Sequence, residues 1–397
     1  MQCRSPAPQA VVREGRALLY IDGIDEAIQP DGRLEPTWMR VFYNPAMTLN
    51  RDLSVVFLNY YASTTGRRLT IVDPLTATGV RAVRYALEVR GVGYVIAGDV
   101  DPRAVCIARL NTELNNVAYA TTVVESDARS LLYEAKHTGI PMHYVDIDPF
   151  GSPAPFTEAA LEAVGRGGIA AFTATDVAVL GGSKSRAAAR RYLVTIGRLR
   201  QYQEVALRVL LGYIARVAAS VDKRIEPLLS YSERHYVRVY VRIDRGARKA
   251  DSMLDEMLGY MYECSDGTVS FSKDDCSSVV RAHGPLWTGK LIEENVAGSL
   301  QALVEDARMG YLQSREDLLR LLDVIQGESG LSMYPAQSIE HVAARLRVSM
   351  PSRRKIIDSL VEEGYEASRV HFSPTGIRTN APPSVLASII KRLSPGP

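Results

Sequence analysis

The sequence predicts an α/β fold in which a parallel, doubly wound sheet ends in an antiparallel hairpin and a smaller α+β domain follows. Two observations indicate this fold. Between residues 69 and 173, short apolar runs alternate with stretches of helical apolar spacing, which is typical of parallel strands joined by helices. Two β-branched runs, 225–231 and 236–243, are separated by only a few residues, so they must pair antiparallel.

The elements follow one another in a regular order. Strands of the parallel part are expected at residues 69–72, 94–97, 121–124, 142–147 and 168–173. Helices are expected at residues 80–89, 102–114 and 128–135, and a longer one at 204–219. A parallel sheet closed by an antiparallel hairpin is the layout of the Rossmann-like methyltransferase sheet, whereas a nicotinamide dehydrogenase would continue with parallel strands.

The alternation stops after Arg245, which marks a domain boundary. We therefore predict a methyltransferase domain with an N-terminal extension at residues 1–245 and a C-terminal domain at residues 246–397. Within residues 338–392, a helix, a turn, a second helix and a short hairpin predict a winged-helix-like part.

Composition and cysteine spacing indicate which classes of protein the chain can belong to. No apolar run of the 397-residue chain reaches the roughly 18 residues that a membrane span needs. The first ten residues lack the apolar segment of a signal peptide, so we expect a cytoplasmic protein. Cys3, Cys106, Cys264 and Cys276 are scattered and predict neither a disulfide framework nor a CxxC metal pair. The net charge of +2 neither demands nor excludes a nucleic-acid partner.

Acidic residues follow four of the expected strands. They are Asp73, Asp99, Asp127 and Asp148. Any one of them alone is better explained as a helix N-cap. Ligands of open α/β sheets bind at the carboxyl ends of the strands, so four acids in the same position predict a ligand site.

The loop from Asp73 to Gly79 predicts which ligand binds there. It contains one glycine, whereas a dinucleotide's pyrophosphate needs several. S-adenosylmethionine has no phosphate, so a single turn glycine after Thr78 suffices. Asp99 is placed to accept hydrogen bonds from both ribose hydroxyls.

Three further residues complete the predicted cofactor pocket. Asp127 with Ala128 is expected near the adenine amino group. Arg81, in the first turn of the first helix, is expected to pair with the cofactor's carboxylate, although a surface role is nearly as well supported.

The stretch Asp148-Pro149-Phe150-Gly151 predicts the reaction. Enzymes that methylate amino groups carry an Asp/Asn-Pro-Pro-aromatic sequence after the fourth strand of this sheet. An exocyclic amine is a poor nucleophile because its lone pair is delocalised into the ring. A carboxylate and a backbone carbonyl that accept its N–H bonds favour the form that attacks, and the aromatic ring stacks on the extruded base. We therefore assign Asp148, Pro149 and Phe150 to catalysis.

Basic residues cluster on the winged-helix-like part. We expect five of them to contact RNA phosphates: Arg353, Arg354, Lys355, Arg369 and Arg378. On charge alone a solvated surface explains the cluster equally well. The aromatic residues Tyr365 and Phe372 among the arginines favour RNA.

Several stretches together resemble the archaeal and eukaryotic tRNA guanine-26 N2-dimethyltransferases, and the resemblance covers most of the chain. They are Phe42-Tyr43-Asn44-Pro45, Asn50-Arg51-Asp52, Ala77-Thr78-Gly79-Val80-Arg81, Asp148-Pro149-Phe150-Gly151-Ser152-Pro153, Thr173-Ala174-Thr175-Asp176, Gly284-Pro285-Leu286-Trp287 and Phe372-Ser373-Pro374-Thr375-Gly376. The resemblance implies two successive methyl transfers from S-adenosylmethionine to a tRNA guanine. It also implies that Arg51, Arg81, Asp99 and Asp127 hold the cofactor, that Asp148 is the catalytic acceptor, and that Phe42 lies beside the cofactor.

The sequence departs from this family at two places. Many relatives carry a four-cysteine zinc site after the catalytic domain, and only Cys264 stands in that region, so we expect no metal. Residues 177–185 lack the Gly, Pro, Cys and His-Pro typical of relatives. The choice between one and two methyl groups therefore stays open.

Two other functions remain compatible with the sequence. One is methylation of a different exocyclic amine, in another tRNA guanine or in a DNA adenine, because any such amine needs the same help. The other is tRNA binding without catalysis, which the intact Asp148-Pro149-Phe150 and Asp99 argue against. Nothing in the sequence indicates an obligate protein partner.

Overall fold

The computed structural model describes residues 10–394, and the chain divides into two compact units. The first comprises Met1–Asp148, Glu158–Ala171 and Ser299–Arg320, and the second comprises Pro149–Thr157, Phe172–Gly298 and Leu321–Pro397. This division does not follow the predicted boundary after Arg245. Residues 299–320 return to the first unit, where the Ser314 backbone N–H donates to Asp52 (2.8 Å).

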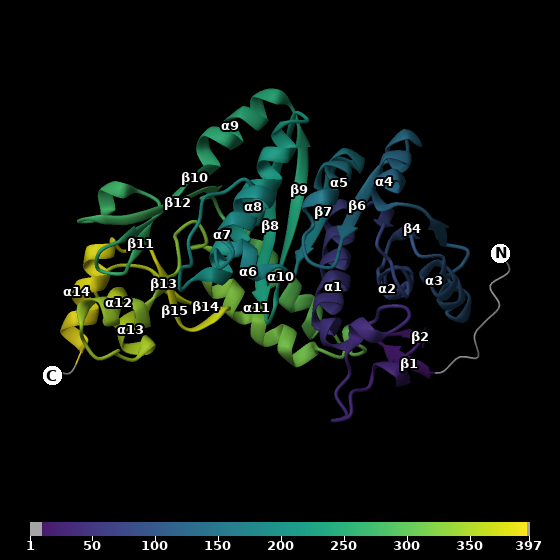
Figure 1. The fold of residues 1–397 in the computed structure, drawn as a ribbon, viewed down its shortest axis with the longest axis horizontal. Coiled ribbons are helices and arrows are strands. Elements are labelled where there is room, and N and C mark those ends of the chain that lie inside the picture. The colour runs from purple at the N-terminus through teal and green to yellow at the C-terminus, as the bar shows by residue number, and fades with distance from the viewer. Residues whose placement is uncertain (1–9, 395–397) are drawn as a thin grey trace. The chain divides into compact units, whose positions relative to one another are not determined.

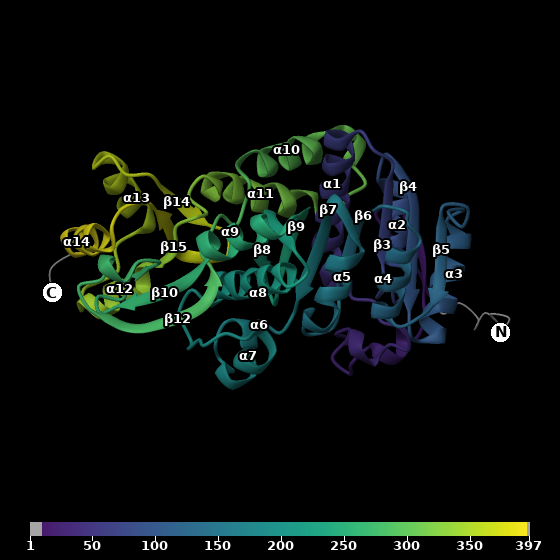
Figure 2. The same ribbon diagram turned by 90° about the horizontal axis from the view of Figure 1, so that it is seen from above.

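A seven-stranded sheet has the order β5-β4-β3-β6-β7-β9-β8 (Figures 1 and 2). Its strands are β3 (Leu69–Asp73), β4 (Val92–Asp99), β5 (Thr121–Glu125), β6 (Met142–Ile147), β7 (Val164–Ala174), β8 (Lys223–Glu233) and β9 (Tyr236–Arg245). The pairs β3–β4, β4–β5 and β3–β6 are parallel, and β8–β9 is antiparallel. The predicted Rossmann-like sheet with an antiparallel terminal hairpin is therefore confirmed.

Helices pack on the sheet of the first unit (Figure 2). They are α1 (Thr48–Thr65), α2 (Val80–Glu88), α3 (Pro102–Leu114), α4 (Ala128–His137) and α5 (Thr157–Ala163). An N-terminal hairpin of β1 (Ala10–Glu14) and β2 (Ala17–Ile21) packs on α2 and α3. Its Leu19 and Ile21 join Val80 and Val83 of α2 in one apolar cluster, so the hairpin extends the core beyond the sheet.

The second unit contains helices that sequence analysis did not resolve. Besides β8 and β9, its elements before the C-terminal part are α6 (Val177–Leu180), α7 (Ser185–Tyr192), α8 (Tyr202–Ala219), α9 (Ala247–Met257), β10 (Leu258–Cys264), β11 (Val269–Ser270) and β12 (Val279–Trp287). Strands β11, β10 and β12 form a separate antiparallel sheet. Helices α10 (Glu294–Glu305) and α11 (Arg315–Ser329) follow, and the stretch Ser299–Arg320 that contains parts of both belongs to the first unit.

The C-terminal part has the predicted winged-helix-like order. It consists of β13 (Gln337–Ser338), α12 (Ile339–Leu346), α13 (Arg353–Glu362), β14 (Ala367–Val370), β15 (Ser373–Thr379) and α14 (Pro383–Leu393). Ser338 and Ser352 cap α12 and α13, which fixes where each helix begins. An apolar cluster that includes Val342, Ile356 and Ile389 joins the three helices.

The cysteines correct one prediction. Cys264, at the end of β10, forms a disulfide with Cys276, 12 residues later, whereas the scattered spacing predicted no disulfide. The two strands β10 and β12 run antiparallel, and the connection between them folds back so that the two cysteines meet. Cys106 is not disulfide-bonded, and Cys3 lies outside the described residues. The absence of a zinc site stays a prediction.

Within residues 10–394, every helix is too short or too polar to span a bilayer.

Candidate active site

The four acids predicted from the strand ends lie at one edge of the sheet. Asp73 and Asp99 are the last residues of β3 and β4. Asp127 is the N-cap of α4, two residues after β5, and Asp148 directly follows β6. Because these strands are parallel neighbours, their carboxyl ends meet on the same side of the sheet.

The loop after β3 is shaped by a close backbone approach. Gly79 has φ +77°, and a Cβ atom there would lie 2.9 Å from the Cβ of Ala108. Any side chain at this position would therefore clash with α3 as well as strain the backbone. The Ala77 N–H donates to Asp99 Oδ2 (2.9 Å), and the Asp101 N–H donates to Asp99 Oδ1 (3.0 Å). Two backbone donors thus fix the orientation of the Asp99 carboxylate.

Two buried polar atoms in this loop have no hydrogen-bond partner in the described part of the chain. They are Oδ1 of Asp73 and Oγ1 of Thr78. The other Asp73 oxygen accepts from the Thr76 hydroxyl (2.8 Å). Burial, together with the nearby charge of Asp146, raises the pKa of Asp73 to about 7. Buried polar atoms are normally satisfied, so this pair suits a polar ligand that supplies the missing contacts.

Arg81 connects α2 to the catalytic candidate Asp148. Its Nε donates to Asp148 Oδ2 (2.8 Å), and a terminal nitrogen contacts the same oxygen. The remaining N–H groups face Asn50 Oδ1 (2.5 Å), Ser54 Oγ (3.2 Å) and Tyr85 OH (3.3 Å). All five guanidinium donors therefore have acceptors within the protein. The predicted contact with the cofactor's carboxylate stays a prediction, and the observed role of Arg81 is to hold Asp148.

The stretch after β6 turns sharply. Gly151 has φ +74°, its N–H donates to Thr175 Oγ1 (2.8 Å) and its carbonyl accepts from the Thr175 N–H (2.9 Å). Phe150 is 69% exposed, and Pro149 before it is half-buried. A large aromatic side chain held outward on a fixed turn is suited to stack on a base.

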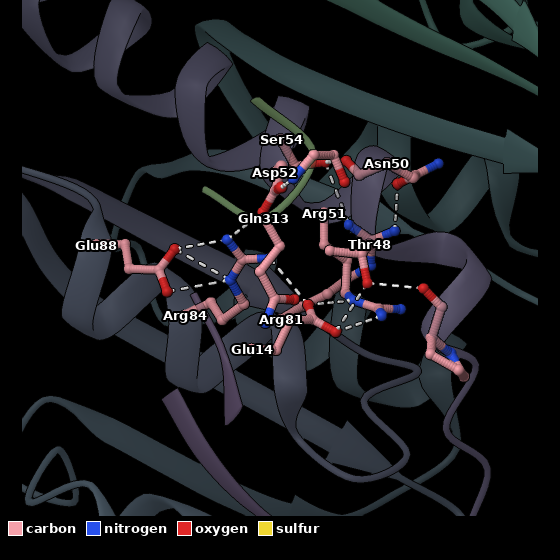
Figure 3. A network of polar contacts seen from close by, with 12 residues as sticks. Glu14, Thr48, Asn50, Arg51, Asp52, Ser54, Arg81, Arg84, Glu88 and Gln313 are labelled. Atoms are coloured by element: carbon pink, nitrogen blue, oxygen red, sulfur yellow. Dashed lines mark hydrogen bonds and ion pairs between the residues drawn. The ribbon is translucent and has the colours of Figure 1, made fainter. Parts of the chain in front are cut away.

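A buried ionic network surrounds the predicted cofactor residue Arg51 (Figure 3). Arg51 donates to both oxygens of Glu14 (2.6 and 2.5 Å). Arg84 bonds to Glu14 (2.9 Å), Asp52 (2.6 Å) and Glu88 (2.8 Å). Burial would raise the pKa of Glu14, but Arg51 and Arg84 outweigh it and lower that pKa to about 2. The guanidinium of Arg51 is thus engaged by the N-terminal hairpin.

The other predicted cofactor residues lie on loops and helix ends. Phe42 is half-buried between two short 3₁₀ helices, Pro36–Trp38 and Pro45–Met47. Asp127 accepts from the backbone of Arg129 and Ser130 (3.1 and 3.2 Å), so it caps α4, which is the role expected for one such acid taken alone. Ala128 is the buried first residue of α4.

Four of the five predicted RNA-contacting residues lie on the surface of the second unit. Arg354, Lys355 and Arg369 are exposed, and Arg353 is half-buried. A groove of about 600 Å³ between α11, α13 and β14 is lined by Arg353, Arg354 and Arg369. The acid Asp323 partly neutralises it, at 3.2 Å from Arg369.

Arg378 corrects the predicted set, because it is completely buried. Its guanidinium pairs with Glu204 (2.9 Å) and Glu328 (3.2 Å), two acids distant in sequence. Ionic contacts with both acids outweigh burial and raise the pKa of Arg378. The residue therefore joins helices α8 and α11 to β15 and cannot present its charge to a phosphate.

Sequence analysis missed a hydrogen-bonded chain beside the Asp-Pro-Phe-Gly turn. The Ser152 hydroxyl lies 2.6 Å from the Tyr192 hydroxyl, which donates to Asp176 (2.8 Å). Asp176 also pairs with Arg191 (2.7 Å). The only signal in the sequence was Asp176 in the family-like stretch Thr173-Ala174-Thr175-Asp176, because Tyr192 lies 16 residues further on.

Comparisons with known proteins identify the family of this chain. A family model described as N2,N2-dimethylguanosine tRNA methyltransferase matches residues 25–391. A tRNA (guanine(26)-N(2))-dimethyltransferase of Aeropyrum pernix is 40% identical, and the match spans 100% of both chains. That of Saccharolobus solfataricus is 36% identical over 96% of this chain and 98% of its own. The structure of Trm1 from Pyrococcus horikoshii with S-adenosyl-L-methionine superposes with a TM-score of 0.84, at 34% identity, over 96% of this chain and 99% of that one. The chain therefore belongs to the N2,N2-dimethylguanosine tRNA methyltransferase family.

Proposed function

We propose that this protein transfers one or two methyl groups from S-adenosylmethionine to the exocyclic N2 of guanine 26 in tRNA. The observation that carries the proposal is the Asp148 carboxylate. It stands at the carboxyl end of β6, is held by Arg81 and heads the Asp-Pro-Phe-Gly turn. Family membership supplies the substrate class.

The residues at the sheet edge fit the cofactor. Asp99, oriented by two backbone donors, would accept from the ribose hydroxyls. The unpartnered Oδ1 of Asp73 and Oγ1 of Thr78 would face the polar methionine part. Asp127 and Ala128 would border the adenine, and Gly79 leaves room for close approach. Bound there, the cofactor supplies an electrophilic methyl group on a sulfonium cation.

The protein's own contribution is to make the guanine amine nucleophilic. Asp148 and the Pro149 carbonyl would accept the two N–H bonds of N2, which withdraws its lone pair from conjugation with the ring. As the new N–C bond forms, the nitrogen becomes cationic, and Asp148 is placed to take the proton that it releases. Preorganised acceptors of this kind, in a site that excludes water, account for a large part of enzymatic rate enhancement.

The domain assignment remains part of the proposal. We assign residues 246–397 to tRNA binding and residues 1–245 to methyl transfer. The groove of Arg353, Arg354 and Arg369 supports the former, because it offers guanidinium groups for phosphates. We also expect the protein to act in the cytoplasm, where tRNA is processed.

Two substrates that differ by one amino group test the proposal. A tRNA transcript with guanine 26 and the same tRNA with inosine 26 would be incubated with enzyme and labelled cofactor. Inosine lacks the exocyclic N2, so label should enter the first transcript alone. Equal labelling of both would show that the acceptor is another atom.

A charge-removing variant tests the C-terminal groove. Replacing Arg353, Arg354 and Lys355 with alanine should raise KM for tRNA and lower the slope of log K against log salt by about 2–3 units. The cofactor constant should stay unchanged. An unchanged salt slope would make this cluster a solvated surface.

A further inference from the structure

A second basic cavity lies in the second unit, and none of its lining residues has been assigned to the candidate site. It has a volume of about 350 Å³ and is lined by Arg198, Leu199, Arg200, Tyr202, Glu263 and His341. Arg198, Leu199 and Arg200 come from the segment that joins α7 to α8, and Tyr202 begins α8. Glu263 comes from β10 and His341 from α12. Three separate parts of the chain thus converge on one cavity.

Positive charge dominates the cavity. Arg198 and Arg200 are exposed and form no ion pair with any residue of the described chain. Glu263 is the only acid among the lining residues, and it already faces His341 (3.6 Å) and Arg345 (3.7 Å). One carboxylate cannot neutralise this set, so the cavity attracts an anion.

A buried histidine, His283, lies close to Glu263. His283 is fully buried, and its Nε2 lies 3.9 Å from Glu263 without a hydrogen-bond partner in the described chain. Its Nδ1 accepts from the Gly197 N–H (3.1 Å), which holds the segment that carries Arg198. The unsatisfied Nε2 is a second sign that this polar cluster lacks a ligand or a bridging group.

The cavity also offers an aromatic surface. Tyr202, the first residue of α8, is 40% exposed, while the neighbouring Leu199 is buried. An exposed aromatic ring beside unpaired arginines is the combination that single-stranded nucleic-acid sites use, with bases stacked on the ring and phosphates on the cations.

A basic segment joins the cavity to the catalytic turn. Helix α7 carries exposed Arg186 and Arg190, and Lys184 precedes it. At the end of α7, Tyr192 bonds to Ser152, which directly follows the Asp-Pro-Phe-Gly turn. From there the chain continues to Arg198, and α7 packs against α6 and α8 (Figure 1).

We propose that this cavity holds one nucleotide of the RNA substrate, with its base on Tyr202 and its phosphate between Arg198 and Arg200. Glu263 would accept a hydrogen bond from a base amino group. The basic segment of Lys184, Arg186 and Arg190 would track the backbone between this nucleotide and the methylated base. The inference rests on the proposed function and extends it to a second point of RNA contact.

Two matched double variants test whether the positive charge of the cavity contributes to tRNA binding. Arg198→Ala with Arg200→Ala should weaken tRNA binding at least about tenfold and reduce the salt slope by about 1.5–2 units. The control, Arg245→Ala with Arg248→Ala, removes the same charge from exposed positions at the end of β9 and in α9. Figures 1 and 2 both show α9 apart from α7, so the control should retain wild-type binding.

Substitutions of Tyr202 test separately whether a base stacks on its ring. Tyr202→Ala should weaken binding about tenfold, whereas Tyr202→Phe keeps the ring and should bind as wild type. With tRNA that carries 4-thiouridine, irradiation should cross-link the peptide around Tyr202. Thermal unfolding with S-adenosylhomocysteine establishes that each variant is folded and binds cofactor.

Three outcomes separate the possibilities. Weaker binding and a cross-link at Tyr202 support the proposal. Affinities equal to those of the control pair, or inorganic phosphate that binds while tRNA contacts stay unchanged, would overturn it. Wild-type enzyme that binds tRNA but transfers no methyl group to it would instead refute the proposed function and leave this RNA contact standing.

Discussion

Cofactor affinity should depend on pH through Asp73. This carboxyl is fully buried at the end of β3, and burial raises its pKa to about 7. The cofactor's methionine part carries an ammonium group with a pKa of about 7.8, so an ionised Asp73 favours its binding. About one-eleventh of Asp73 is ionised at pH 6 and about three-quarters at pH 7.5, given the pKa that the structure supports. Affinity for S-adenosylhomocysteine should therefore rise about five- to tenfold between these values.

Calorimetry across this pH range measures the effect. Asp73→Asn keeps the shape of the side chain but cannot ionise, so its affinity should be nearly flat below pH 7.5. Asp101→Asn is the matched control, because Asp101 caps α3 at the same sheet edge and asparagine caps equally well. If wild type and Asp73→Asn show the same pH dependence, Asp73 does not titrate with cofactor binding.

The same pKa shift predicts how the stability of the ligand-free protein depends on pH. Folding raises the Asp73 pKa from 3.8 to about 7, so the folded state binds more protons between these values. The stability that protonated Asp73 contributes to the folded state is fully present below pH 4 and is lost as the pH rises through 7. The free energy of unfolding changes by up to ~4 kcal/mol over this range. At pH 8, Asp73→Asn should therefore unfold at a higher urea concentration than wild type.

Three further substitutions test separate parts of the site. Asp148→Ala should lower kcat by about 10²–10³ and leave S-adenosylhomocysteine affinity intact; near-normal turnover would remove it from catalysis. Asp99→Ala should weaken that affinity tens- to a hundredfold, or about 2–3 kcal/mol, and unchanged calorimetry would exclude it from the pocket. Glu14→Gln should lower the free energy of unfolding by about 3 kcal/mol, because the pKa of Glu14 falls from 4.5 to about 2 on folding. This contribution is present above pH 4.5 and fades as the pH falls towards 2, so equal urea midpoints at pH 7 would contradict the network's role.

Local patterns predicted the sheet and the position of the four acids at the carboxyl ends of its strands. The β-branched runs, the helical spacing between them and the acids after each strand are all encoded within short stretches. Helix α1 escaped prediction because its buried residues include charged ones, such as Arg51 and Asp52, which form ion pairs inside the protein. A helix buried on nearly every side shows little apolar periodicity.

Contacts between residues that lie far apart in the chain could not be predicted from the sequence. Arg378 looked like a surface arginine, but its partner Glu204 lies 174 residues away. Arg81 meets Asp148 across 67 residues, so its role in holding the catalytic candidate appears only in the fold. Cys264 and Cys276 were read as unpaired because nothing in a 12-residue spacing indicates that the chain folds back between them.

The most direct test of the central claim is mass spectrometry of nucleosides from tRNA incubated with the enzyme and S-adenosylmethionine. The proposed function predicts N2-methylguanosine, with or without N2,N2-dimethylguanosine, mapped to position 26, and formation of either product about 10²–10³ times more slowly with Asp148→Ala. A methyl group on adenine, on another guanine or on a ring nitrogen would contradict it, as would full activity of the variant.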